Sequence, residues 1–292
     1  MASAQKTFRD AVRTEGFTIT GQLRLHQDVS AREILGQARI LAPRVNAVAI
    51  TDNPFGVLHL SGLAAAAILL RDGIDPLLHL SARDRNRIAL KSELLGAAAL
   101  GVTSLLLQRG DRLPRDSEVT QVFDTGAKKF LATARQLSQF QVSRGEPELF
   151  LGTMATVFDP EADWQPTELQ AKITAGAEFI QTQACLDLDL LRRYLKRLVA
   201  AQVTWHCHLV VSIPVLTSVE SARWLFEHSR GAVIPQSVVR RFEQAADAEA
   251  FGVAYCAELI QAVKEIPGVR GVNLSTMGDV QAMVEVIRRA TQ

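Results

Sequence analysis

Short apolar runs alternate with amphipathic segments along almost the whole chain. The runs that have the composition of β-strands occupy residues 17–25, 45–51, 76–80, 103–107, 149–155, 179–183, 205–213 and 271–274. Segments with helical periodicity occupy residues 30–41, 61–71, 83–100, 126–139, 166–175, 188–201, 219–227, 249–266 and 279–290. This alternation favours a parallel sheet, and eight repeats favour its closure into a (β/α)8 barrel. An open, doubly wound sheet is the alternative.

The length and evenness of this pattern predict one domain. The 292 residues fit a single barrel of about 250 residues with additions, one of them a polar helix-like segment at 235–246. We therefore expect a single (β/α)8 TIM barrel over residues 1–292, with residues 1–15 as an N-terminal extension. No apolar run reaches about 18 residues without a charge, and the first residues lack an apolar signal core, so neither a membrane span nor a signal peptide is expected.

Charge and cysteine content narrow the functional classes. Lys plus Arg number 32 and Asp plus Glu number 31, so the net charge does not favour nucleic acid as a partner. Cys185, Cys207 and Cys256 are scattered without a CxxC motif, which is typical of reduced thiols in a cytoplasmic protein. His206 and His208 would share one face of a strand, but no acidic third ligand is nearby, so packed histidines are favoured over a metal site.

Polar residues gather at the C-terminal ends of five predicted strands. They are Gln22, the segment 51–53, His79, the segment 109–111, and Gln181 with Gln183. Each one alone could be a helix cap or a hydrogen-bonded core residue. Because barrel enzymes build their active sites at this end of the strands, the set together predicts a ligand-binding site. No GxGxxG or GxxxxGK[ST] motif follows a strand, so the usual phosphate-binding loops are missing.

Four of these segments form a series that resembles a known family. They read VAITDN at 48–53, HLS and RDRN within 79–86, RGD at 109–111 and GAEFIQTQ at 176–183. In order and spacing they are similar to the methylenetetrahydrofolate reductases, the flavin-dependent barrel enzymes of one-carbon metabolism. The resemblance runs from about Thr18 to Ile287, which is nearly the whole chain.

This resemblance implies that FAD lies across the mouth of the barrel. Its contacts would be Thr51, His79, Arg109, Gly110, Asp111 and Lys172. Asp111 would also lie near the folate, and Gln183 would bind the pterin ring, because an amide offers both a donor and an acceptor to a heterocycle edge. Hydride would pass from NADH or NADPH to the flavin and then to the folate. The implied activity is the interconversion of 5,10-methylene- and 5-methyl-tetrahydrofolate.

The first strand departs from the family pattern. The family has a glutamate there, in a motif like ElxPPR, which supplies a proton as the folate ring opens. Here residues 20–27 read TGQLRLHQ, so Gln22 takes the place of that catalytic acid. A positioned acid contributes about 10²–10⁴ in rate, so the reaction should be slow unless another group donates. His26 shares a strand face with Gln22, but about 13 Å away by the usual rise.

Three interpretations therefore remain open. The chain is a reductase of this family; or a flavin-free folate oxidoreductase of a one-carbon or demethylation pathway; or a non-catalytic family member that binds folate or supports a partner subunit. Two further departures keep the alternatives open: Ala-Cys-Leu at 184–186 replaces the family's aromatic residues, and the adenine-side segment 163–168 matches weakly. A reduced folate is the expected ligand, nucleic acid and membranes are not expected partners, and a homo-oligomer is compatible with the sequence.

Overall fold

The protein is a closed barrel. The structure, a computed structural model, describes residues 7–14, 16–113, 119–229 and 231–292, and within them eight parallel strands pair in sequence order until β8 meets β1. The strands are β1 Thr18–Gln22, β2 Ala47–Ile50, β3 Pro76–Ser81, β4 Ser104–Gln108, β5 Phe150–Ala155, β6 Phe179–Thr182, β7 His208–Val215 and β8 Val269–Thr276. The predicted single (β/α)8 TIM barrel is confirmed, and the open sheet is excluded.

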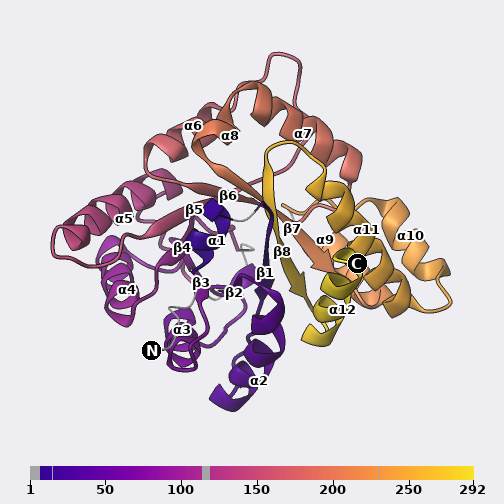
Figure 1. Cartoon of the computed structure of the whole chain (residues 1–292), viewed down its shortest axis with the longest axis horizontal. Coiled ribbons are helices and arrows are strands. Elements are labelled where there is room, and N and C mark those ends of the chain that lie inside the picture. The colour runs from indigo at the N-terminus through magenta and orange to yellow at the C-terminus, as the bar shows by residue number, and fades with distance from the viewer. Residues whose placement is uncertain (1–6, 15, 114–118, 230) are drawn as a thin grey trace.

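Helices surround the barrel and cover its outer face (Figure 1). They are α2 Ala31–Leu41, α3 Gly62–Arg71, α4 Arg87–Leu100, α5 Ala127–Val142, α6 Thr167–Thr174, α7 Leu188–Ala200, α8 Val203–His206, α9 Val219–His228, α10 Gln236–Gln244, α11 Ala248–Lys264 and α12 Val280–Ala290. Two short 3-10 turns are η1 Ala42–Arg44 and η2 Pro54–Gly56. The predicted segment at 235–246 forms α10, which enlarges the connection between β7 and β8.

The seventh strand begins later than its composition predicts. Residues 203–206 form the short helix α8, and Trp205 on it is 71% exposed. The preceding Gln202 has a left-handed backbone (φ 57°), which ends α7 and starts a new helical turn. His206 and His208 therefore do not alternate along one strand. Within the described ranges, no group of three or more His, Cys, Asp or Glu side chains is placed to hold a metal ion.

Helix α4 also begins later than predicted, at Arg87 instead of residue 83. Asn86 caps it, because its side-chain oxygen accepts a hydrogen bond from the backbone N–H of Ala89 at 3.0 Å. Residues 83–86 therefore form a loop at the C-terminal end of β3. This boundary matters for function because it leaves the charged RDRN segment at the mouth of the barrel.

Alternation along the strands decides which side chains enter the barrel. Leu77, Leu106, Phe150 and Phe179 belong to a buried apolar cluster that fills its interior. Successive side chains of a strand point to opposite faces, so His79, two residues beyond Leu77 on β3, faces the same interior. Apolar side chains thus fill the N-terminal part of the barrel interior, and polar side chains line the interior toward the C-terminal ends of the strands.

Helix α1, Phe8–Thr14, covers the opposite, N-terminal end of the barrel (Figure 1). Phe8 is fully buried, and its ring lies edge-on to Phe150 at 5.9 Å and to Phe179 at 5.5 Å. Its backbone N–H donates to a carboxylate oxygen of Asp75 at 2.7 Å. Part of the predicted extension, residues 8–14, therefore anchors the core; residues 1–6 and 15 lie outside the described ranges.

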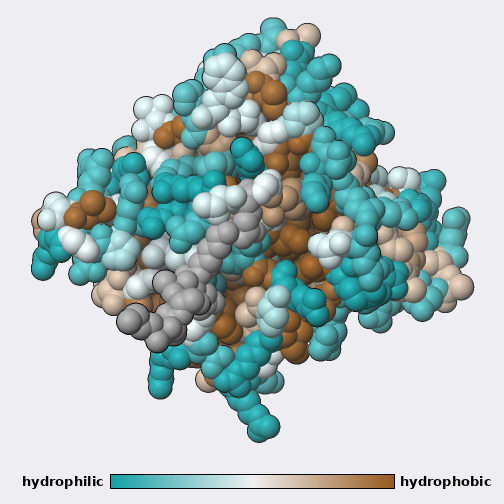
Figure 2. Space-filling view, in the orientation of Figure 1, coloured by the Kyte–Doolittle hydropathy of each residue, from teal (hydrophilic) through white to brown (hydrophobic). Residues whose placement is uncertain are grey.

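Hydrophilic residues form most of the outer rim of the molecule. In the orientation of Figure 1, hydrophilic side chains form most of the rim, while apolar ones gather near the centre (Figure 2). No helix in the part of the chain that the structure describes is long and apolar enough to cross a membrane.

The cysteines are free and buried, and burial raises the pKa of Cys185 to about 11 and that of Cys256 to about 12, so both thiols are protonated.

Candidate functional site

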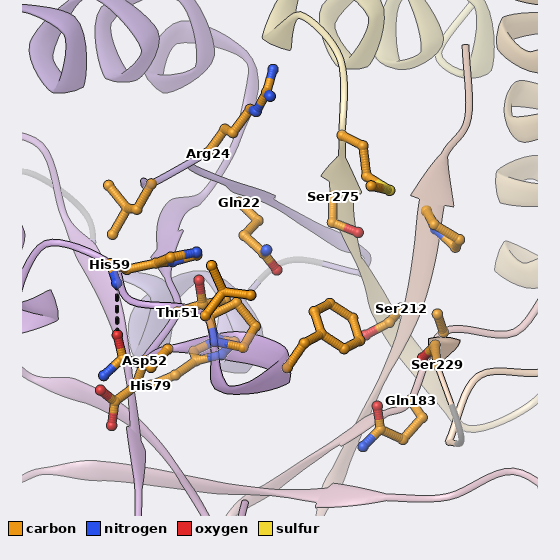
Figure 3. Close-up of a pocket in the computed structure, with 18 of the residues that line it drawn as sticks. Gln22, Arg24, Thr51, Asp52, His59, His79, Gln183, Ser212, Ser229 and Ser275 are labelled. Carbon is orange, nitrogen blue, oxygen red and sulfur yellow. Dashed lines mark hydrogen bonds between the residues drawn. The ribbon is translucent and has the colours of Figure 1, made fainter. Parts of the chain in front are cut away.

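A cavity of about 450 Å³ opens at the C-terminal mouth of the barrel. Six of the eight residues predicted as flavin, folate or catalytic positions line it, namely Gln22, Thr51, His79, Gly110, Asp111 and Gln183. Figure 3 shows Gln22, Thr51 and His79 on one side of this cavity, with Gln183 and Ser212 on the other. We call it the central cavity. The structure therefore brings together residues that lie far apart in the sequence, and their individual roles remain predictions.

A second cavity of about 910 Å³ lies beside the first. The two share a wall that includes Gly110, Asp111 and Gln183. Arg109 and Lys172, both predicted flavin contacts, line this second cavity instead of the central one, together with Lys128 on the first turn of α5. We call it the cationic cavity, because guanidinium and ammonium groups at a helix N-terminus form a suitable environment for phosphate oxygens.

The position of Lys172 suits an anion. It lies on α6, and its ammonium donates to the backbone carbonyl of Met154 at 3.2 Å and pairs with Glu168 at 3.0 Å. The Glu168 side chain is 83% exposed, so this ion pair is weak and can be exchanged for a ligand. Arg109 is held differently, with its guanidinium 4.6 Å above the ring of Phe123.

Several buried polar atoms at the mouth have no hydrogen-bond partner among the described residues. They are Oγ1 of Thr51, Nε2 of His79, Oε1 of Gln181 and Oγ of Ser212. Leaving such atoms unsatisfied costs about 1–3 kcal/mol each, so a ligand that supplies partners is favoured. Burial lowers the pKa of His79 to about 4, so its imidazole is neutral near pH 7 and can offer a donor or an acceptor.

A buried ion pair at the wall of the central cavity joins the loops that follow β2 and β3. Asp52, next to Thr51, accepts two hydrogen bonds from the guanidinium of Arg85, at 2.6 and 3.0 Å. The same carboxylate accepts the backbone N–H of Ser81 at 2.8 Å. Bidentate pairing of this kind restricts both partners. Residues 83–86 after β3 and residues 51–53 after β2 are therefore held together as one unit.

Gly110 is required by its surroundings, and this gives a prediction. Its φ is +85°, and an added Cβ would overlap the hydroxyl of Ser81 and lie 2.8 Å from Cβ of Arg83. We expect Gly110→Ala to reduce the free energy of unfolding by about 1–3 kcal/mol, measured by denaturant unfolding, because backbone strain and overlap add.

Gly101→Ala is the matched control for that prediction. Gly101 also has a positive φ, +88°, but nothing lies within 4 Å of the position that an alanine Cβ would take there. The free energy of unfolding of Gly101→Ala should therefore fall only by the part that comes from backbone conformation. Equal losses in the two variants would contradict a steric role for Gly110 at the mouth.

Several lining residues have no counterpart in the sequence-based prediction. They are Phe55, His59, Lys128 and Trp224. Phe55 and Asn53 both have positive φ, 58° and 45°, which turns the loop after β2 back over the mouth. Phe55 meets Trp224 of α9 edge-on at 4.9 Å. The Asn-Pro-Phe-Gly sequence of this loop indicates a turn, but it does not reveal that the turn reaches a site.

Comparisons with known proteins place the chain in a family. No curated protein sequence matches the chain. Among solved structures, the chain is similar to 2,3-dimethylmalate lyase, a member of the PEP mutase/isocitrate lyase superfamily, with a TM-score of 0.53 and 13% identity over 100% of this chain and 85% of that one. A likeness at this identity supports the barrel fold alone. The family model described as methylenetetrahydrofolate reductase matches residues 37–291. The chain therefore belongs to the methylenetetrahydrofolate reductase family.

Proposed function

We propose that this folate-related oxidoreductase reduces 5,10-methylene-tetrahydrofolate to 5-methyl-tetrahydrofolate with NADH or NADPH, through FAD bound at the barrel mouth. The observation that carries the proposal is the pair of adjoining cavities. One contains unsatisfied buried polar atoms at Thr51 and His79, and the other contains cations at Arg109 and Lys172. A cofactor with a polar ring at one end and phosphates at the other would fit these two adjoining cavities.

The residues present fit FAD. Oγ1 of Thr51 and Nε2 of His79 are buried without partners among the described residues, as expected for atoms that a bound ring system would satisfy. Gly110 allows close approach of a ligand to the backbone, since it has no side chain at the shared wall. Arg109, Lys128 and Lys172 would hold the phosphates in the cationic cavity.

The folate would occupy the central cavity. Gln183 offers an amide donor and acceptor to the pterin edge, and Figure 3 shows it across the cavity from Gln22. Asp111 lies on the wall shared by both cavities, so its carboxylate would face the ring system and the folate together. The residues after Gln183, Ala-Cys-Leu at 184–186, are not aromatic. Phe55 and Trp224 supply aromatic surface to this cavity instead.

The protein's contribution is orientation and electrostatics. Bound FAD would supply the transfer of hydride equivalents between a nicotinamide and the folate. Neutral His79 avoids placing a buried positive charge at the base of the cavity. The Asp52–Arg85 pair keeps the Thr51 end of β2 in place. Phe55 and Trp224, which meet edge-on at 4.9 Å, would place apolar surface beside the bound ligand.

The absorbance spectrum of the purified protein, followed by a turnover assay, tests the proposal. We expect flavin absorbance, or reconstitution by added FAD, and oxidation of NADH or NADPH that depends on methylene-tetrahydrofolate. Turnover without any flavin would favour the flavin-free oxidoreductase. Folate binding without turnover by the flavin-loaded protein would favour the non-catalytic family member.

Lys172→Ala gives a prediction for the cationic cavity. We expect the dissociation constant of FAD to rise by about 10-fold or more, because a charge-assisted hydrogen bond contributes about 1.5–3 kcal/mol. The measurement is flavin fluorescence during titration of the apoprotein.

Lys196→Ala is the control for Lys172→Ala. Lys196 is exposed on α7 beside the cleft that faces α11, away from the mouth. Its removal changes the net charge by the same amount and should leave FAD affinity unchanged. Equal affinities for the two variants and the wild type would contradict phosphate binding by Lys172.

A further inference from the structure

The central cavity lacks a carboxylic acid at Gln22, but it contains other groups that can carry a proton. An amide has no proton of suitable acidity to give, so Gln22 cannot act as a general acid. The titratable and charged groups that line this cavity besides His59 are Arg24, His26, Asp52, His79, Arg83 and Asp111. The carboxylate of Asp52 is engaged by the guanidinium of Arg85, and His79 is neutral near pH 7 because of its burial.

His59 differs from these groups in its placement. It lies in the loop between β2 and α3, and its backbone N–H donates to the side-chain oxygen of Asn53 at 2.9 Å, which fixes the position of the residue. Its side chain is half-buried, and Figure 3 shows the imidazole extending toward the carboxamide of Gln22. Nδ1 is buried and has no hydrogen-bond partner in the described part of the chain.

The groups around His59 tune its protonation. Burial lowers its pKa below the usual value, the charge of His26 acts in the same direction, and the carboxylate of Asp52 opposes both. The pKa of His59 is therefore lowered mainly by its burial, whereas the fully buried His79 has its pKa lowered to about 4. Among the cavity's histidines, His26 is exposed at the outer edge, so it is poorly placed to protonate an enclosed substrate.

We propose that His59 is a catalytic residue that donates the proton which the family's glutamate supplies elsewhere. This inference rests on the proposed function. The imidazolium would give its proton to N10 of methylene-tetrahydrofolate as the bond between N10 and the methylene carbon breaks, with the electron pair staying on N10. The lone pair of N5 forms the C=N bond of the iminium, which then accepts hydride derived from the reduced nicotinamide. Solvent reprotonates His59, so each turnover consumes one hydride and one proton.

His59→Gln in the full-length, FAD-reconstituted protein tests the proposal. We expect kcat for methylene-tetrahydrofolate reduction to fall by about 10²-fold or more, since a positioned acid contributes about 10²–10⁴. In the wild type, kcat should rise as pH falls through the pKa of His59, because only the protonated form donates, and His59→Gln should lose this dependence. Binding of 5-methyl-tetrahydrofolate should change by less than about 3-fold, which separates loss of the proton from loss of the cavity.

A second variant shows whether the proton is what has been lost. Adding Gln22→Glu to His59→Gln should restore at least the wild-type rate, because the carboxyl group provides another donor. His206→Gln is the control, since His206 is exposed on α8, outside the mouth, and its loss should change neither kcat nor the pH profile. Nitrogen-15 NMR of the histidines should show the His59 ring signal shifting when 5-methyl-tetrahydrofolate binds.

The outcomes separate this inference from the proposed function. An active wild type whose rate and pH profile survive His59→Gln would overturn the role of His59 and leave the proposed function intact. A wild type that is inactive until Gln22→Glu is introduced would also overturn it, while supporting folate binding at this site. A protein that neither binds nor reduces the folate, with or without Gln22→Glu, would overturn both.

Discussion

Gln22→Glu is expected to raise the rate of methylene-tetrahydrofolate reduction near pH 7 by about 10-fold or more. Gln22 lines the central cavity at the end of β1, and half-burial there should raise the pKa of an introduced carboxyl group. Such a group would stay protonated in a larger fraction of molecules than an exposed glutamate. It would therefore add a second proton donor to the central cavity, beside His59.

Steady-state kinetics of wild type and Gln22→Glu across pH 5 to 8 measure this effect. Gln22→Asn is the control, because it changes the side chain without adding an acid, and it should produce no gain. A rate for Gln22→Glu at or below that of the wild type throughout the range would show that proton donation does not limit this enzyme. The glutamine would then mark different chemistry, and an unpaired buried carboxylate would explain any loss of binding.

The arrangement of the barrel follows from the sequence because periodicity acts locally. Each apolar run of the right length and composition forms a strand, and alternation along β3 places Leu77 and His79 on the same interior face. The C-terminal ends of parallel strands necessarily meet at one mouth, so Gln22 and Gln183 could be assigned to one site without coordinates.

The remaining parts of the site depend on loop geometry, which periodicity does not describe. His59 and Phe55 lie on the loop after β2, whose direction is set by the positive φ of Asn53 and Phe55. Trp224 lies on a helix that packs against the barrel, and only the tertiary structure turns it toward the cavity. The predicted strand at 205–213 is present as β7, but its predicted start at Trp205 is wrong, since the left-handed Gln202 starts a helical turn there.

Asp52→Ala is expected to reduce the free energy of unfolding by about 3–5 kcal/mol, measured by denaturant unfolding. The side chain of Asp52 is 3% exposed and that of Arg85 is 18% exposed. Removing the carboxylate would leave the guanidinium largely buried without its charge partner and the backbone N–H of Ser81 without its acceptor. Because the same carboxylate joins the ends of β2 and β3, FAD retention should fall as well.

Asp159→Ala removes a similar pair at the surface and serves as the control. Asp159 accepts two hydrogen bonds from Arg193, at 3.0 and 2.9 Å, but both side chains are more than half exposed. Solvent screens such a pair, so its loss should leave stability close to the wild-type value. Asp52→Asn, which keeps the size of the side chain and one acceptor, should fall between wild type and Asp52→Ala. If Asp52→Ala destabilises no more than Asp159→Ala, the buried pair does not hold the two strand ends together, and the position of Thr51 must depend on the packing of β2 alone.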